Sequence, residues 1–225
     1  MNRNLVLVGT FLLVGAFAAF IAGCSSDENG GGGGASFSAT TYYPLGLGAE
    51  WTFVNDSGDT AVYRIPDTLT IDGHLVYRII HTKPGGTDTI LATIINGGIY
   101  TYISDLDSFV CILPATFSIG QSWVVFSRDS TWNTGGYDYH TWTEINVKAM
   151  GTESVSTPAG SFNAIKFMSV EESGYSIAVG DSAIEDVEYD TTYSWLAANV
   201  GEVKNLESDG TTWSLVEYFL GNPVK

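Results

Sequence analysis

Short apolar stretches alternate with turn residues along most of the chain. From about Tyr42 onward the stretches are rich in Val, Ile, Thr, Tyr, Phe and Trp, and breaks recur roughly every 8–12 positions, which is typical of strands joined by hairpins. The fold class is therefore expected to be all-β, as an antiparallel barrel or a strongly curved two-layer sheet. The pattern predicts strands near residues 50–55, 60–65, 67–71, 74–82, 87–95, 98–103, 107–113, 122–129, 138–148, 151–156, 162–171, 174–179, 187–194, 202–208 and 211–219.

Several breaks carry the chemistry of tight turns. Asp72-Gly73 and Asn96-Gly97 each pair a residue that tolerates positive φ with a glycine, as short β-hairpins require. The one candidate for a helix, 177–189, is interrupted by Gly180 and has too few apolar positions at helical spacing.

Two of the predicted strands are apolar on both faces. Residues 75–80 and 90–95 place apolar side chains at successive positions, and successive side chains point to opposite faces of a sheet. One face must pack in the core, and the other needs a second layer, a neighbouring protein or a cavity. We expect a second layer.

The first 24 residues have the pattern of an export segment. Arg3 precedes an uninterrupted apolar or small-residue run over 5–22, and Ile-Ala-Gly-Cys stands at 21–24. This ending resembles the bacterial lipobox, in which small residues precede an obligatory cysteine. The resemblance implies cleavage before Cys24 and lipid attachment there, through diacylglycerol and further acylation, palmitate included. An uncleaved membrane anchor is the alternative, because the run reaches the lower limit of spanning length.

The residues after Cys24 have the composition of a flexible tether, with the glycine run Gly30–Gly34 at its centre. We therefore divide the chain into a lipoprotein signal peptide (1–23), a lipidated cysteine with a Gly/Ser linker (24–41) and a single all-β domain (42–225). Ser25 stands where, in some bacteria, Asp would direct retention in the inner membrane. This favours the outer membrane, at its periplasmic face or at the cell surface.

The chain is strongly acidic, with 25 Asp and Glu against 9 Lys and Arg and a net charge of −16. Such a surface repels the phosphates of nucleic acids and offers no basic patch to anionic lipid headgroups. Solubility outside the cytoplasm is the simplest role of the charge, and cation binding is the alternative.

A Gly-x-x-Trp element occurs twice, at 48–51 and at 120–123, each time flanked by apolar residues. The glycine suits a turn that feeds a strand, and the indole is expected to enter the core.

Three motifs together resemble a group of secreted bacterial lipoprotein domains of unknown function. They are Tyr-Pro-Leu…Gly-x-x-Trp at 43–51, Val-x-x-Pro-Ala-Gly-x-Phe at 155–162 and Trp-x-Ala…Val-Gly-x-Val-Lys at 195–204, in the order of that group. The resemblance implies an all-β lipoprotein, in some members with curved sheets related to lipid or lipoprotein carriers, and it carries over no catalytic residue. One departure is that Gly46-Leu47 stands where the group often has Lys or Arg. The motifs have the character of scaffold, with Phe162 and Trp195 as core anchors.

The sequence contains no recognisable catalytic motif. His74, His81 and His140 form no zinc pattern, and there is no nucleophile elbow, P-loop or dinucleotide fingerprint. With Cys24 lipidated, Cys111 would have no partner in the chain, and its apolar surroundings predict a small buried hydrophobe. We therefore predict no catalytic residue, metal or cofactor, and we favour a non-catalytic protein without excluding an enzyme.

Two groups of side chains remain as weaker site candidates. An acidic group, expected to form one loop, could hold Ca²⁺, but its spacing differs from that of a calcium loop and favours solvation. An aromatic group surrounds a Gly-Gly turn and would face a ligand if exposed, although we favour burial in the core. The acidic group is Asp181, Glu185, Asp186, Glu188 and Asp190, and the aromatic group is Trp132, Tyr137, Tyr139 and Trp142.

Three functions remain open at this point. The first is a lipid-anchored, monomeric envelope protein that binds a partner protein or an apolar ligand. The second is a surface carbohydrate-binding module or glycosidase that uses the aromatic and acidic groups. The third is a structural surface lipoprotein without a small ligand. In each of these functions, the protein is attached to the membrane by its N-terminal lipid. Its candidate partners are envelope proteins, lipids or glycans.

Overall fold

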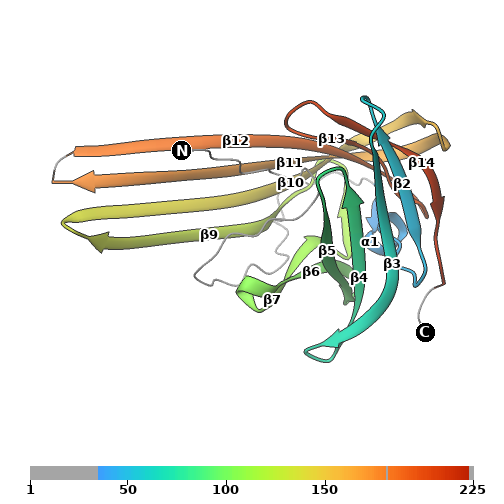
Figure 1. Cartoon of the computed structure of the whole chain (residues 1–225), viewed down its shortest axis with the longest axis horizontal. Coiled ribbons are helices and arrows are strands. Elements are labelled where there is room, and N and C mark those ends of the chain that lie inside the picture. Colours follow the sequence, from blue (N-terminus) through green and yellow to red (C-terminus); the bar gives the residue numbers. More distant parts are fainter. Residues whose placement is uncertain (1–34, 181, 223–225) are drawn as a thin grey trace.

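The structure is a computed structural model that describes residues 35–180 and 182–222 (Figure 1). Nearly all of the described chain is β-structure. The strands that form the main sheet are β2 (Glu50–Asn55), β3 (Thr60–Ile71), β4 (His74–Lys83), β5 (Gly86–Ile95), β6 (Gly98–Ile103), β7 (Ser108–Leu113), β9 (Ser122–Thr134), β10 (Tyr137–Thr157), β11 (Gly160–Val179), β12 (Ser182–Ala197), β13 (Gly201–Leu206) and β14 (Thr212–Phe219).

These strands form one antiparallel sheet in the order β7-β6-β5-β4-β3-β2-β14-β13-β12-β11-β10-β9. The sheet curls until its two edge strands, β7 and β9, contact each other without a hydrogen-bonded ladder between them. At this seam the indole N–H of Trp123 on β9 donates to the carbonyl of Ile112 on β7 at 3.2 Å. The fold is thus a nearly closed antiparallel barrel, and the expected all-β class is confirmed.

Asp72-Gly73 and Asn96-Gly97 form the tight turns that the sequence predicts, between β3 and β4 and between β5 and β6. Their φ angles are 49° and 80° in the first turn and 50° and 85° in the second. Two successive positive φ angles match the twist of the flanking strands in two-residue hairpins.

In some places, two strands that the sequence predicts as separate are one continuous strand in the structure. Pro66 stands where the sequence suggests a break in β3, and the ladder to β4 skips there, between Arg64 and Asp67, because proline has no N–H to donate. The gap expected after 148 in β10 is a bulge between Ala149 and Gly151. A bulge absorbs an extra residue without ending the strand.

The ordered fold begins before Tyr42. β1 (Ser36–Ser38) pairs with β8 (Thr116–Ser118) in a separate two-stranded sheet, and the short helix α1 (Ala39–Tyr42) follows. Ala39 is fully buried, and the N–H of Asn199 donates to the carbonyl of Thr41 at 2.7 Å. Residues 36–41, which the sequence analysis assigns to the linker, are therefore part of the fold. Elements this short carry no hydrophobic period that the sequence could reveal. A further single turn, η1 (Ser104–Leu106), connects β6 to β7.

Two clusters of buried side chains fill the barrel, and each contains one Gly-x-x-Trp indole. Trp51, 9% exposed, packs with side chains of β2–β5, β13 and β14, while Trp123, 3% exposed, packs with those of β6, β7 and the inner ends of β9–β12. The Trp51 N–H donates to the carbonyl of Val200 at 2.7 Å, 149 positions away. Both indoles therefore enter the core as expected, and both also hydrogen-bond a distant backbone carbonyl.

We predict that Trp51→Phe lowers the free energy of unfolding by about 1–3 kcal/mol, because it leaves the buried Val200 carbonyl without its donor. Chemical denaturation followed by circular dichroism measures this change. Trp132→Phe, at a side chain that is 47% exposed, is the matched control and should change stability by no more than about 0.5 kcal/mol. Equal effects of the two substitutions would contradict the role given to the Trp51 hydrogen bond.

Candidate functional site

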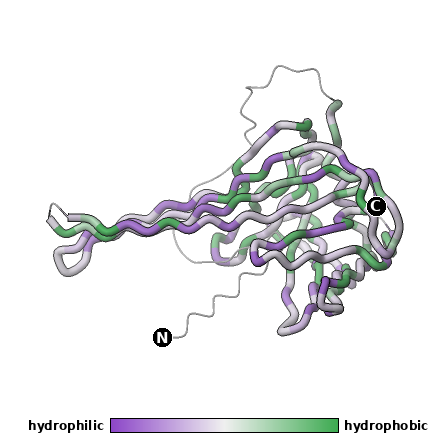
Figure 2. The backbone as a smooth tube through the Cα atoms, turned by 90° about the horizontal axis from the view of Figure 1, so that it is seen from above, coloured by the Kyte–Doolittle hydropathy of each residue, from purple (hydrophilic) through white to green (hydrophobic). Residues whose placement is uncertain are grey.

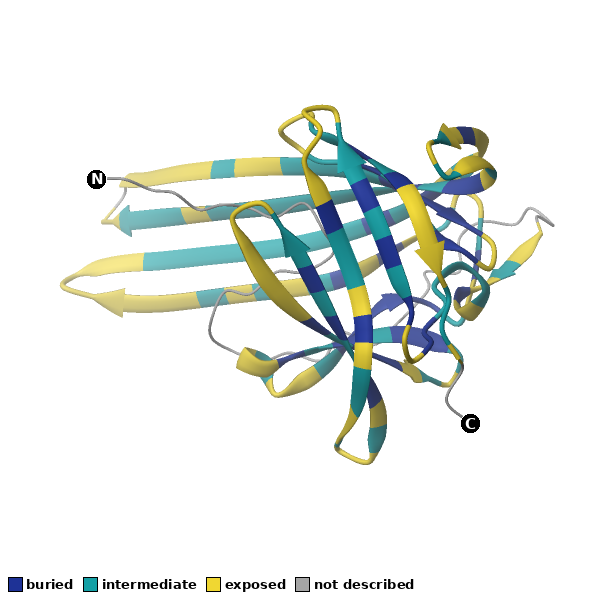
Figure 3. Ribbon diagram, turned by 45° about the vertical axis from the view of Figure 1, so that its right-hand side comes forward, coloured by how far each residue is buried: buried dark blue, intermediate teal, exposed yellow. Residues whose placement is uncertain are grey.

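Four strands extend well beyond the barrel as a free-standing sheet (Figures 1 and 2). We call this part the blade; it comprises residues 126–134 of β9, 137–146 of β10, 168–179 of β11 and 182–193 of β12. No described residue of the blade is buried, whereas the same strands carry buried residues where they enter the barrel (Figure 3). Ten residues of strand rise about 3.3 Å each, so the blade projects by roughly 30 Å.

One face of the blade carries a row of large apolar side chains near its tip. Trp132, Tyr139, Ile177 and Ile184 are aligned across the four strands by the register of the ladders, and cross-strand partners share a face. The rings of Trp132 and Tyr139 stack with an interplanar angle of 4°. Ile184 is 68% exposed. We call this surface the distal aromatic face; its members are Trp132, Tyr137, Tyr139, Tyr175, Ile177, Val179 and Ile184.

Trp142, the fourth predicted aromatic residue, lies on the opposite face. It is paired with Gly174, and a Cβ on that glycine would lie 2.3 Å from the indole, so the ring rests directly on the glycine backbone. The Trp142 N–H donates to Glu172 at 3.1 Å, and the ring stacks on His140, which contacts Asp129 at 2.8 Å. The contacts of Trp142 are therefore with the blade itself. The four aromatics do not form one surface, and burial in the core, which we favoured, is wrong for Trp132 and Tyr137, both exposed.

The predicted acidic loop is instead a strand. Glu185, Asp186, Glu188 and Asp190 lie in β12, and Asp181 lies outside the described residues. Glu185 points to one face while the other three point to the opposite one, spaced two residues apart, so the carboxylates do not converge. Within residues 35–180 and 182–222, no group of three or more His, Cys, Asp or Glu side chains could hold a metal ion. In the described ranges, no helix is both long enough and apolar enough to cross a membrane.

A second candidate site lies inside the barrel. A cavity of about 80 Å³ is bounded by apolar side chains of β2–β5, among them Phe53, Ile65 and Ile79, and by Tyr43 and Glu202. A cavity of about 40 Å³ lies in the other core cluster, and a third of about 10 Å³ lies among polar side chains. All three are lined by Glu202, which therefore stands between the two core clusters.

A bulge in β13 directs Glu202 inward. The ladder to β12 pairs Leu196 with Glu202 and Trp195 with Lys204, so Val203 is the extra residue. In a regular strand, residues three apart point to opposite faces. Here the Asn205 amide N–H donates to the Glu202 carboxylate at 3.0 Å. The bulge thus lets both polar side chains reach the interior.

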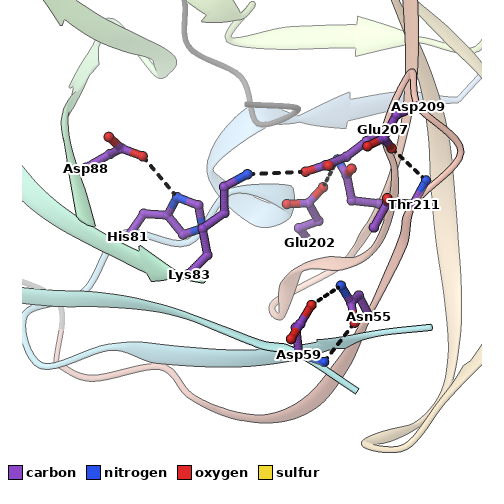
Figure 4. A network of polar contacts seen from close by, with 10 residues as sticks. Asn55, Asp59, His81, Lys83, Asp88, Glu202, Glu207, Asp209 and Thr211 are labelled. Carbon is purple, nitrogen blue, oxygen red and sulfur yellow. Dashed lines mark hydrogen bonds and ion pairs between the residues drawn. The ribbon is translucent and has the colours of Figure 1, made fainter. Parts of the chain in front are cut away.

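Figure 4 shows the polar side chains around Glu202, which we call the interior cluster: His81, Lys83, Glu202 and Glu207. Burial shifts the pKa values of several of these groups. Desolvation raises the pKa of Glu202 to about 7, and the neighbouring Glu207 adds to the rise. Glu207 contacts Lys83 at 3.7 Å, yet burial still raises the pKa of Glu207 because desolvation outweighs the attraction of the lysine.

His81, also in this cluster, is neutral at pH 7. It is 2% exposed and stacks on Tyr63 with ring centres 4.1 Å apart. Asp88 lies 3.9 Å away, but desolvation and the nearby Lys83 lower the pKa of His81 to about 4. At neutral pH the pair with Asp88 is therefore not an ion pair.

The sequence analysis missed this interior cluster. Glu202 falls in the stretch 195–204, which we interpreted as scaffold, and Lys83 and Glu207 stand at the ends of predicted strands. A carboxylate between the buried Val200 and Val203 was the one available indication. The bulge that turns it inward has no pattern in the sequence.

Cys111 is buried in β7 at 2% exposure, as expected of a small hydrophobe. The other cysteine of the chain, Cys24, lies outside the described residues, so its lipidation stays a prediction.

No described protein family and no curated protein sequence matches the chain. Two solved structures are similar to it at 16% sequence identity. A candidate lipoprotein from Parabacteroides distasonis aligns over 80% of this chain and 98% of its own with a TM-score of 0.41. A candidate exported protein with a YmcC-like fold from Bacteroides fragilis aligns over 80% and 99% with a TM-score of 0.38. Likenesses this distant transfer no function to the chain.

We predict that the Glu202→Gln variant is more stable than the wild type, by an amount that grows as the pH rises. The folded pKa of about 7 lies above the ordinary 4.5, so the native state holds an extra proton between these values and the wild type loses stability there. The gain of the variant should grow from pH 4.5 to 7, reach at most about 3 kcal/mol and then level off. Denaturant titrations across this pH range measure it.

His81→Phe is the matched variant with the opposite sign. The folded pKa of His81 lies below the ordinary 6.5, so the wild type loses stability as pH falls from 6.5 to 4. The variant should lack this loss. Parallel pH profiles for both variants and the wild type would contradict the burial of these two groups.

Proposed function

We propose that the protein is a lipid-anchored, non-catalytic protein of the bacterial cell envelope that binds a partner protein through the distal aromatic face of its blade. The observation that carries this proposal is a row of apolar side chains, exposed on a sheet that stands clear of the barrel. Exposed contiguous apolar surface of this kind marks interaction sites.

The composition of the face favours a protein surface over a sugar. Ile177, Val179 and Ile184 contribute branched aliphatic side chains, which pack against protein side chains and offer no flat platform to a sugar ring. Trp132, the largest ring, is already stacked on Tyr139. Tyrosine and tryptophan are the residues that interface cores favour.

The charge of the blade favours a basic partner. Residues 126–146 and 168–193 contain ten Asp and Glu and one basic residue, Arg128. Like charges on a second copy would repel it, and acidic side chains along the outer edge of β12 discourage edge-to-edge pairing of strands. This supports the expected monomer, and it makes a surface rich in Lys and Arg the complementary one.

The lipobox at 21–24 and the glycine run behind it support anchoring at Cys24. Two or three acyl chains anchor a protein stably, and a flexible tether lets the domain stand away from the bilayer. Ser25 supports an outer-membrane address over the inner membrane.

We predict that a photo-crosslinking residue at position 184 captures a basic protein in intact cells, whereas the same residue at position 189 does not. Ile184 and Tyr189 lie on one strand, are 68% and 64% exposed, and point to opposite faces. Mass spectrometry of the crosslinked bands measures the difference. Equal crosslinking from both sites would remove the distal aromatic face as the binding surface. Glycan-array binding that Trp132→Ala abolishes, without a crosslink from 184, would favour the carbohydrate function instead.

We predict that Cys24→Ala releases the protein from the membrane fraction into the soluble envelope fraction. The substitution removes the sulfur that would carry the lipid, and therefore the acyl chains that hold the domain. Mass spectrometry of the N-terminal peptide of the wild type should show diacylglycerol and acyl masses on Cys24. An unmodified Cys24, or one linked to Cys111, would refute the anchor.

A further inference from the structure

Two of the interior cavities share a wall, and their linings differ in polarity. The cavity of about 80 Å³ is lined mainly by apolar side chains, whereas the cavity of about 10 Å³ is lined by the polar or charged side chains of His81, Lys83, Asn205 and Glu207 together with Ala61 and Trp213. Phe53, Tyr63 and Glu202 border both. An apolar chamber therefore adjoins a small polar one, with a carboxylate at the boundary.

Above the Glu202 pKa of about 7, where this carboxyl is ionised, the polar chamber has one more negative group than positive groups. Glu202 and Glu207 are carboxylates, Lys83 is the one cation that lines the chamber, and it pairs with Glu207 at 3.7 Å. His81 is neutral, as described above. A single positive charge placed beside Glu202 would neutralise the excess negative charge of the side chains that line the chamber.

The chamber also contains two buried polar atoms without a hydrogen-bond partner among the described residues, the carbonyl oxygen of Asn205 and the indole N–H of Trp213. The indole N–H is directed at Glu207, whose pKa it lowers, so the Asn205 oxygen is the open acceptor. Asn205 is 7% exposed and gives its amide N–H to Glu202, while its carbonyl oxygen has no hydrogen-bond partner among the described residues. Leaving a buried acceptor unmatched costs roughly 1–3 kcal/mol. A donor group in the polar chamber would satisfy both this oxygen and the Glu202 carboxylate.

We propose that the barrel interior binds a small molecule with a primary ammonium head and a short apolar body. The ammonium lies in the polar chamber against Glu202 and the Asn205 carbonyl, and the body lies in the apolar chamber. An ammonium group carries three donors and one positive charge, which matches the two acceptors and the unbalanced carboxylate.

The volumes set the size of the ligand. The polar chamber, at about 10 Å³, is at the lower limit for one water molecule, which is close in size to an ammonium group. A cavity of about 150 Å³ holds benzene, so the apolar chamber, at about 80 Å³, suits a body of about three to five carbons. Phe53, Ile65 and Ile79 are buried where they line it, whereas Tyr43, Pro44 and Tyr63 are half-buried. A full acyl chain exceeds this space.

The test uses n-butylammonium chloride as the probe, n-butanol as its neutral isostere and sodium chloride as the control for ionic strength. Thermal unfolding of the full chain in detergent is followed at pH 8, where Glu202 is ionised. Binding to the native state alone raises the melting temperature with probe concentration. We expect n-butylammonium to raise it and sodium chloride to leave it unchanged, with n-butanol at least tenfold less potent.

Two variants separate binding from folding. Glu202→Gln keeps the shape of the side chain and removes its charge, and it should weaken the response to n-butylammonium at least tenfold while leaving that to n-butanol unchanged. Glu185→Gln, on the exposed blade, should respond as the wild type does. The proposal is overturned if the wild type does not respond, if n-butanol is equally potent, or if Glu202→Gln responds fully, as it would if the polar chamber held only water.

Discussion

The anchoring of β9–β12 in the barrel is the constraint on which the rest of the structure depends. These strands are buried where they form the wall, around Val147, Phe167 and Leu196, and none of their described residues is buried further out. The blade therefore has little hydrophobic stabilisation of its own. The hydrogen-bonded ladders between these strands continue from the packed barrel into the blade, and they hold the blade strands in register. The blade can stand free in water because the other half of each of its strands belongs to a packed core.

The interior of the barrel shows how a small irregularity in the backbone places polar groups. The bulge at Val203 turns Glu202 and Asn205 to the same side, into a space otherwise filled by the two core clusters. Burial then acts in opposite directions on the two titratable groups of this space, raising the pKa of Glu202 and lowering that of His81. In both cases the neutral form is favoured, as expected where desolvation exceeds the attraction of nearby charges. Groups with shifted pKa values are concentrated at functional sites in proteins, although structural ion pairs shift them too.

Much of the fold could be predicted from the sequence, and the site could not. Strand-forming residues and the Asp72-Gly73 and Asn96-Gly97 turns indicate the antiparallel order, and the Gly-x-x-Trp repeat indicates two core indoles, because these are local properties. Whether Trp132 is buried or exposed depends instead on how far its strand extends past the barrel. That extension is set by the lengths of all four paired strands together, which is not a local property of the sequence. The acidic run in β12 has the composition of a loop because Asp is depleted in strands, and because the consecutive Glu185 and Asp186 would place charge on both faces of a strand. It is a strand here because neither face of the blade is covered by the described residues.

The pairing of β2 with β14 has a consequence for how the protein reaches this structure. The first strand of the wall is joined to the last, with Asn55 opposite Trp213, so the barrel cannot close before nearly the whole chain is present. Hairpins such as β3–β4 and β10–β11 are local and form quickly, whereas contacts of high sequence separation form late. If the protein is exported as proposed, its chain would emerge from the N-terminus, and β2 would wait with one edge unpaired until β14 had crossed the membrane. On that route the folding step that completes the barrel would be coupled to the end of translocation, and the unpaired β2 is the segment that a folding helper would need to shield.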